Sequence, residues 1–197
     1  MDIRKTIESL ERKGFSVRFF ETGGEAADYV CSECRGRTVG MGGSMTIKQL
    51  GLPERLREEC TLYAHQYDGD SSIPLAAGAE LYLTSANGIS ETGEIINIDG
   101  RGNRVASTLY GHERVIIISG VNKIAPDIAS AMDRARNIAG PLNARRLKRK
   151  TPCAMGDEMK CYNCSSPERI CRGFVILDRP MMGMGCEVVL INGELGY

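Results

Sequence analysis

Four cysteines near the C-terminal end of the sequence are close enough along the chain to share a metal. Cys153, Cys161, Cys164 and Cys171 follow the pattern C-x7-C-x2-C-x6-C. Two thiolates separated by two residues can reach one metal from a single turn, and the flanking cysteines complete four ligands. Both an iron–sulfur cluster and zinc accept this ligand set. The alternatives to a metal are free thiols in a flexible loop and a disulfide formed in air.

A glycine-rich segment has the composition of an anion-binding loop. The segment Gly40–Thr46 reads GMGGSMT and lies between a predicted strand and a predicted helix. Glycine lets the backbone approach a ligand, and the N–H groups that open a helix attract anions. The candidate ligand contacts are Gly42, Gly43, Ser44 and Thr46. The alternative is a tight turn in which Ser44 caps the helix. No Lys-Ser or Lys-Thr pair follows the glycines, so this is not a Walker loop.

The segment from residue 81 to 107 combines short apolar runs with polar residues at their ends. Such runs predict strands joined by tight turns, and polar side chains at strand ends are common in binding sites. The candidate ligand-binding residues here are Asn87, Asp99, Asn103 and Arg104. The alternative is that these residues only shape the turns, which asparagine and aspartate favour.

Two residues are candidates for catalysis. Glu91 could act as a general base, or it could bind N–H groups of its own loop, while Glu94 is expected to be solvated. Lys123 follows a continuous apolar run that predicts a strand buried on both faces. Sheets of α/β proteins bind ligands at such strand ends, so Lys123 is the best candidate for a cation in the site and Asn122 for a ligand contact.

The basic run from residue 145 to 150 is predicted to be a solvated helix end, where positive charge is favourable, although it could attract RNA or a nucleotide. Arg145 remains a candidate ligand-binding residue.

The two histidines, His65 and His112, have no carboxylate or cysteine partner at a suitable spacing, so both are predicted to be structural.

The other four cysteines are predicted to be structural. Cys31 and Cys34 fall inside a predicted helix, whereas redox pairs usually begin one. Cys60 and Cys186 have the surroundings of small buried apolar residues.

Composition narrows the class of protein. The chain has 197 residues, 42% hydrophobic and 25% charged, with a formal net charge of zero. A balanced charge argues against nucleic acid as the main partner. No apolar run approaches the ~20 residues of a membrane helix, and the charged N-terminus is unlike a signal peptide. We therefore expect a cytoplasmic protein, in which clustered cysteines indicate metal or redox chemistry.

The order of the predicted elements indicates an α/β fold. Helices are predicted over residues 3–13, 23–34 and 126–139, and strands alternate with helices through the first half. This alternation predicts a mixed, mostly parallel sheet flanked by helices. The apolar run from Val105 is predicted to be a strand. No long linker divides the chain, so residues 1–197 are predicted to form one domain, with the Cys-rich residues 151–172 as a metal-binding excursion.

Several of these motifs together resemble the LUD domain family, the lactate-utilisation proteins. The matching segments are GMGGSMT at 40–46, LTSANGISETGEIINIDGRGNRVA at 83–106, GVNKI at 120–124, NARRL at 143–147, TPC…CYNC…SPERIC at 151–171 and the closing VVLINGELGY. The resemblance implies a fold similar to the NagB/RpiA/CoA-transferase group, with substrates at the strand ends. It also implies that Glu91 could be a nucleophile, as in the CoA-transferases. The lactate-oxidation setting favours a 4Fe-4S cluster over zinc.

These observations lead to two hypotheses about function. In the first, the chain is an enzyme or enzyme subunit that binds a small anionic or phosphate-bearing metabolite and takes part in the oxidation of organic acids, alongside iron–sulfur partner proteins. In the second, it is a non-catalytic accessory or regulatory protein, and the Cys loop docks an electron-transfer partner. A third, weaker one is a metal-stabilised interaction module. A homodimer is compatible with each of them.

Overall fold

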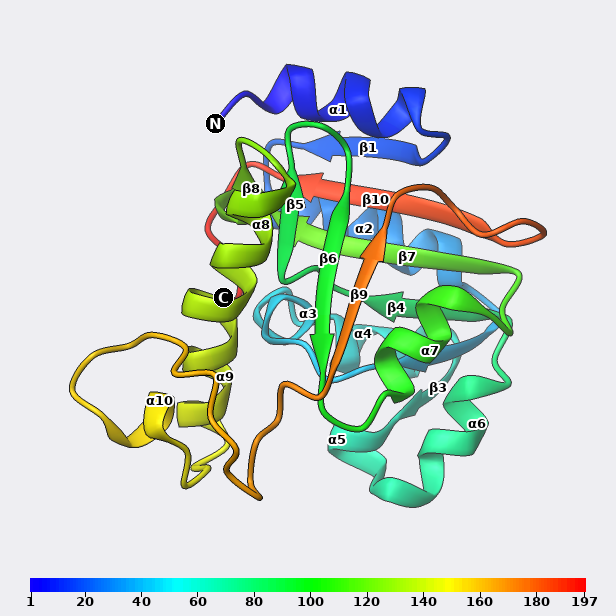
Figure 1. Cartoon of the computed structure of the whole chain (residues 1–197). Coiled ribbons are helices and arrows are strands. Elements are labelled where there is room, and N and C mark those ends of the chain that lie inside the picture. The colour runs from blue at the N-terminus through cyan, green and yellow to red at the C-terminus, as the bar shows by residue number, and fades with distance from the viewer.

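The computed structural model describes all 197 residues and arranges them as two sheets with surrounding helices (Figure 1). The larger sheet has six strands in the order β1-β10-β7-β4-β2-β3, and every neighbouring pair is parallel. Its strands are β1 (Ser16–Phe20), β2 (Thr38–Met41), β3 (Thr61–Ala64), β4 (Leu81–Thr84), β7 (Arg114–Gly120) and β10 (Gly185–Ile191). The prediction of a mostly parallel sheet flanked by helices is confirmed.

The second sheet has four strands in the order β8-β5-β6-β9 and mixed directions. Its strands are β5 (Gly88–Ser90), β6 (Ile95–Asp99), β8 (Ile124–Ala125) and β9 (Gly173–Leu177). β6 pairs antiparallel with both β5 and β9, whereas β5 and β8 are parallel. The strands β5 and β6 of the predicted 81–107 region therefore belong to a separate layer and not to the main sheet.

Ten α-helices and several single turns connect the strands. The α-helices are α1 (Ile3–Arg12), α2 (Gly23–Cys34), α3 (Met45–Gln49), α4 (Leu52–Glu59), α5 (His65–Asp68), α6 (Ile73–Ala77), α7 (Asn103–Leu109), α8 (Ile128–Arg134), α9 (Gly140–Arg146) and α10 (Pro152–Met155). The turns are η1 (Asp70–Ser72) and η2 (Val121–Lys123), which are 3-10 helical, and η3 (Ala135–Ala139), a π-helical turn that joins α8 to α9. None of the helices is long and apolar enough to cross a membrane.

The central strand β7 is covered on both faces, which explains its continuous apolar sequence. Ile116 and Ile118 belong to one core cluster, and Val115 and Ile117 belong to the other. Successive side chains of a strand point to opposite faces, so alternate residues supply the two clusters. The main sheet therefore lies between two apolar layers.

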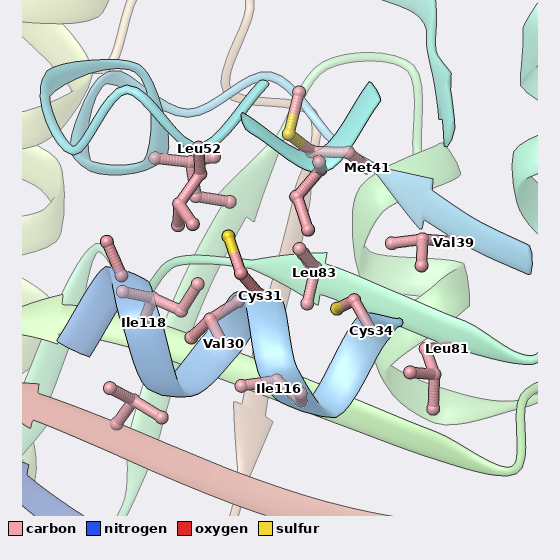
Figure 2. Close-up of a cluster of buried hydrophobic side chains, with 14 of the residues drawn as sticks. Val30, Cys31, Cys34, Val39, Met41, Leu52, Leu81, Leu83, Ile116 and Ile118 are labelled. Atoms are coloured by element: carbon pink, nitrogen blue, oxygen red, sulfur yellow. The ribbon is translucent and has the colours of Figure 1, made fainter. Parts of the chain in front are cut away.

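One face of the main sheet is covered by α2 and α4. Their side chains pack with Leu83 of β4 and Ile116 of β7, and Cys31 and Cys34 of α2 lie inside this cluster (Figure 2). Burial raises the pKa of the Cys34 thiol to about 12, so it is not a reactive thiolate. The prediction that these two cysteines are structural is confirmed.

The opposite face is covered by α1 and the second sheet. Leu10 of α1 joins Ile89 of β5 and Ile95 of β6 in the second core cluster, against Ile117 of β7. The second sheet therefore replaces the helical layer that a regular α/β protein would place on this face.

The run from Val105 is a helix, so its prediction as a strand was wrong. Short apolar runs cannot be assigned to helix or strand from periodicity alone. Here Gly102 adopts a left-handed conformation, with φ of +90°, and α7 begins immediately after it. The Asp99 carboxylate accepts a hydrogen bond from the Val105 N–H at 3.1 Å, which satisfies a free donor in the first turn of α7.

The chain order of the parallel strands places a binding edge at the centre of the sheet. From β2 the chain moves outward to β3 and then returns to pair β4 with the other side of β2. In open α/β sheets, ligands bind outside the carboxyl ends of the strands at such a reversal. The residues that follow β2, β4 and β7 meet there.

Candidate functional site

A cavity of about 470 Å³ opens at the carboxyl ends of β2, β4 and β7. Gly43 follows β2, Ser85 follows β4 and Lys123 ends the turn after β7, and all three line the cavity. Its outer wall comes from α9 and from the Cys-rich segment between α10 and β9. This size is typical of sites for small molecules.

Lys123 forms the floor of the cavity and is 2% exposed. Its ammonium group donates hydrogen bonds to Thr46 Oγ1 at 2.7 Å and to Ser85 Oγ at 2.8 Å. Every ion pair in the structure joins other residues, so this buried lysine has no carboxylate partner. Burial, together with the positive charges of Arg134 and Arg104, lowers the Lys123 pKa to about 7.

Arg104 stands beside Lys123 and is held by the surrounding backbone and amides. Its guanidinium donates to Asn97 Oδ1 and to the Ile98 carbonyl, both at 2.5 Å, and to Asn87 Oδ1 at 3.3 Å. Gly42 makes room for it, because a Cβ atom at that position would lie 2.9 Å from the Arg104 side chain. Arg104 is therefore a fixed positive charge in the wall of the cavity.

Positive groups outnumber negative ones around the cavity. Besides Lys123 and Arg104, the lining includes Arg101, Arg146, Arg149, Arg169 and Arg172, against the carboxylates of Asp99 and Glu168. Both carboxylates already accept hydrogen bonds from the backbone: Asp99 from N–H groups of its own turn and Glu168 from the Lys150 N–H. Since the whole chain carries no net charge, this concentration of positive charge is local and favours an anionic ligand.

The structure brings most of the predicted ligand-binding residues to this cavity. The predicted residues that line it are Gly43, Ser44, Thr46, Asn87, Asp99, Asn103, Arg104 and Lys123. Ser44 also caps α3, because its hydroxyl accepts from the Ile47 N–H at 3.2 Å.

Three other predicted ligand-binding residues do not line the cavity. Gly42 packs against Arg104 and the Tyr82 hydroxyl. The Asn122 side chain accepts from the Leu195 N–H at 3.2 Å. Arg145 is exposed and donates to the Gly156 carbonyl at 3.1 Å. Each of these residues supports the chain around the site and has no lining surface of its own.

Glu91, the predicted general base or nucleophile, lies away from the cavity. Its carboxylate accepts from the Asp2 N–H at 2.8 Å and from Lys5 Nζ at 3.2 Å. These contacts, first the Asp2 N–H and then Lys5, lower the Glu91 pKa.

Glu94 is not solvated as expected, because it binds Lys13, and its pKa falls to about 2 despite the burial that opposes the shift. Both glutamates attach the region of α1 to the second sheet.

Ser85, Gln66 and Arg169 line the cavity but were not predicted as site residues. Ser85 directly follows the apolar run of β4, so its position at a strand end was a usable signal. Gln66 and Arg169 had no such signal, because α5 and the Cys-rich segment reach the cavity only through the tertiary fold. His65, expected to be structural, also lines the cavity, whereas His112 is buried and bonded to the Ala79 carbonyl.

The four clustered cysteines line a second, smaller hollow of about 20 Å³ next to the first. Cys171 lines both. All four are free thiols and partly exposed. No group of three or more His, Cys, Asp or Glu side chains is arranged to hold a metal ion. The spacing of the cysteines in the sequence therefore brings them to one place without forming a ready site for a single ion.

Comparisons with known proteins identify the family. No curated protein matches the chain. The crystal structure of a DUF162 family protein from Deinococcus radiodurans has a similar fold, with a TM-score of 0.55 and 13% identity over 97% of this chain and 96% of that chain. The model of the LUD domain matches residues 3–191. The chain belongs to the LUD domain family, the lactate-utilisation proteins, as its motifs predicted.

Proposed function

We propose that this protein binds a small anionic metabolite, bearing a carboxylate or a phosphate, in the cavity at the strand ends, and that it takes part in the oxidation of organic acids such as lactate. The observation that carries the proposal is Lys123, a buried ammonium group with two hydroxyl partners and no carboxylate. Burying an unpaired charge is unfavourable, so such a group is retained where a ligand supplies the opposite charge.

The chemistry of the cavity fits such a ligand. Thr46 and Ser85 offer hydroxyl groups beside the Lys123 ammonium, and Arg104 adds a fixed cation. A lysine with a pKa of about 7 exists in both protonation states at neutral pH, so Lys123 could also give or take a proton.

Calorimetric titration with inorganic phosphate and with lactate tests this function. We expect at least one of them to bind, and Lys123→Ala to weaken binding about 10- to 100-fold, since a hydrogen bond to a charged group contributes about 1.5–3 kcal/mol. Lys48→Ala is the matched control, because Lys48 is an exposed lysine on α3 outside the cavity lining. Equal affinities in wild type and Lys123→Ala would refute the assignment.

One observation favours the alternative of a non-catalytic accessory protein. The Cys-rich segment exposes Met155, Met159 and Tyr162, with 73%, 41% and 43% of their surfaces accessible. Exposed apolar side chains gathered on one segment suit docking of a protein partner. Oxidation of lactate by the isolated chain with an artificial electron acceptor would decide for the enzyme; ligand binding without turnover would decide for the accessory role.

A further inference from the structure

The hollow lined by the four cysteines has features of a built site. Its remaining lining is mainly apolar and includes Ile98, Pro141 and Phe174, with two cations, Arg136 and Arg169. Arg136 also lies over the Phe174 ring, with its guanidinium carbon 5.8 Å from the ring centroid. An apolar surrounding with cations suits a cofactor whose thiolate ligands bring negative charge.

Hydrogen-bond donors point at the cysteine sulfurs. Cys161 Sγ accepts from the Asn163 N–H at 3.4 Å and from Arg136 Nη2 at 3.8 Å. Thr151 Oγ1 lies 3.3 Å from Cys153 Sγ. Hydrogen bonds to the ligating sulfurs are among the means by which proteins adjust iron–sulfur clusters. The sulfurs of Cys153 and Cys161 therefore have the kind of hydrogen-bond partners that the cysteine ligands of a cluster have.

The helix next to this hollow has an uncommon conformation. Residues Ala135–Ala139 form a π-helical turn, a feature that often occurs at functional sites. Two residues of this turn reach the cysteine segment: Arg136 contacts Cys161 Sγ, and Asn137 Oδ1 accepts from the Cys161 N–H at 2.8 Å. The π turn therefore supplies both a cation and an anchor for the middle of the cysteine motif.

Four thiols that line one hollow make up the full ligand set of a [4Fe–4S] cluster. Around one zinc ion, four sulfurs at about 2.3 Å from the metal lie close to one another. In a [4Fe–4S] cluster each cysteine binds a different iron, so the sulfurs stand further apart. All four thiols line one hollow here, and this hollow must open before it can hold either group.

Cluster binding would also affect the cavity at the strand ends. The hollow of about 20 Å³ must widen to take a cluster. Residues 156–172 contain no helix or strand that would oppose this movement. Arg169 is tied to this segment, because its guanidinium donates to the carbonyls of Cys164 at 2.7 Å and Cys171 at 2.8 Å, and it lines both spaces.

We propose that Cys153, Cys161, Cys164 and Cys171 bind one [4Fe–4S] cluster, and that loading it repositions Arg169 in the wall of the anion cavity. The coupling to the cavity rests on the proposed anion-binding function; the cluster itself does not. Because coupling between two binding sites is reciprocal, a cluster that improves anion binding is itself bound more tightly in the presence of the anion.

The first test is anaerobic reconstitution of the full chain with ferrous iron and sulfide, followed by iron analysis and an absorption spectrum. We expect about four irons per chain and a broad visible band near ~400 nm. The double variant Cys161→Ala/Cys164→Ala should lose the band while keeping the far-ultraviolet circular dichroism of the folded chain. Cys60→Ala, which removes a thiol outside the hollow, should keep both. Wild-type protein that binds no iron and shows no band, or an unchanged band in the double variant, would overturn the cluster.

The second test compares the dissociation constant of inorganic phosphate for loaded and unloaded protein. We expect at least ~5-fold tighter binding to the loaded form, the lower end of typical coupling, and no difference in Arg169→Ala. Equal constants in the wild type would overturn the coupling and leave the anion site intact. No phosphate or lactate binding in either form would overturn the proposed function and the coupling together, while the iron content would still decide the cluster.

Discussion

Lys123 is the residue at which stability and binding conflict. Its ammonium group is buried with only the hydroxyls of Thr46 and Ser85 as partners. Those two hydroxyls also bond to each other, at 3.2 Å, so they keep a partner if the lysine is removed. We therefore expect Lys123→Met to raise stability at pH 7 by at least ~1 kcal/mol, or roughly 2–4 °C in Tm, while phosphate binding becomes weaker. Thermal unfolding with and without phosphate measures both effects, and a lower Tm for the variant would contradict the account.

The titration of Lys123 gives this stability a defined pH dependence. Its pKa is about 7 in the folded chain, against about 10.4 in an unfolded one. Between these values the unfolded state binds a proton that the folded state does not, so the lysine's contribution to stability rises with pH across this window and is constant below about 7. We expect the difference in unfolding free energy between Lys123→Met and wild type to shrink from pH 7 to pH 9. A difference that is constant over this range would show that the folded-state pKa is not lowered.

Ligand affinity should have the opposite dependence on pH, because the protonated ammonium attracts the anion. Sulfate is a suitable probe, since its charge does not change near neutral pH. We expect its dissociation constant to rise as pH increases through about 7 and to become independent of pH in Lys123→Ala. Calorimetry in buffers at pH 6 and 8.5 measures the change. The same slope in both proteins would assign the titration to another group.

At the scale of elements, Glu91 acts as the attachment point of α1. It binds the Asp2 N–H and Lys5 at the start of the chain, and no part of it lines the anion cavity. We expect Glu91→Gln to leave the phosphate dissociation constant within about twofold of wild type and to speed hydrogen exchange in α1. Lys5→Ala should reproduce the exchange effect, because it removes the other half of the ion pair. A large loss of affinity in Glu91→Gln would restore the catalytic role suggested by the sequence.

At the scale of the whole molecule, a chain without net charge concentrates positive groups around one cavity. The local field attracts anions, and dissolved salt screens charges beyond the Debye length of about 10 Å at 0.1 M. We expect phosphate affinity to fall several-fold between 0.05 and 0.5 M potassium chloride. Titration at three salt concentrations measures this, with Lys48→Ala as a variant that should keep the wild-type slope. An affinity independent of salt would mean that short hydrogen bonds alone hold the ligand.

Much of the fold could be predicted because its signals are local. The apolar run of β7 indicated a strand buried on both faces, and the spacing of Ile3, Ile7 and Leu10 indicated α1. The run from Val105 could not be assigned in the same way, because a short apolar run suits either structure. Its helical state depends on the left-handed Gly102 and on the Asp99 carboxylate that binds the Val105 N–H.

The sequence by itself determined which residues follow the parallel strands, and therefore that Thr46, Asn87 and Lys123 would share a binding edge, since the carboxyl ends of parallel strands lie together. Only the tertiary structure decided that Arg104 reaches the same edge, because it lies on α7 after a strand of the second sheet. Only the tertiary structure decided that Glu91 faces α1, because its partners lie more than eighty residues away in the chain. The tertiary structure alone also placed the cysteine segment against the anion cavity. This segment has no helix or strand, so long-range contacts decide which surface it packs on, and the spacing of residues in the sequence does not reveal those contacts.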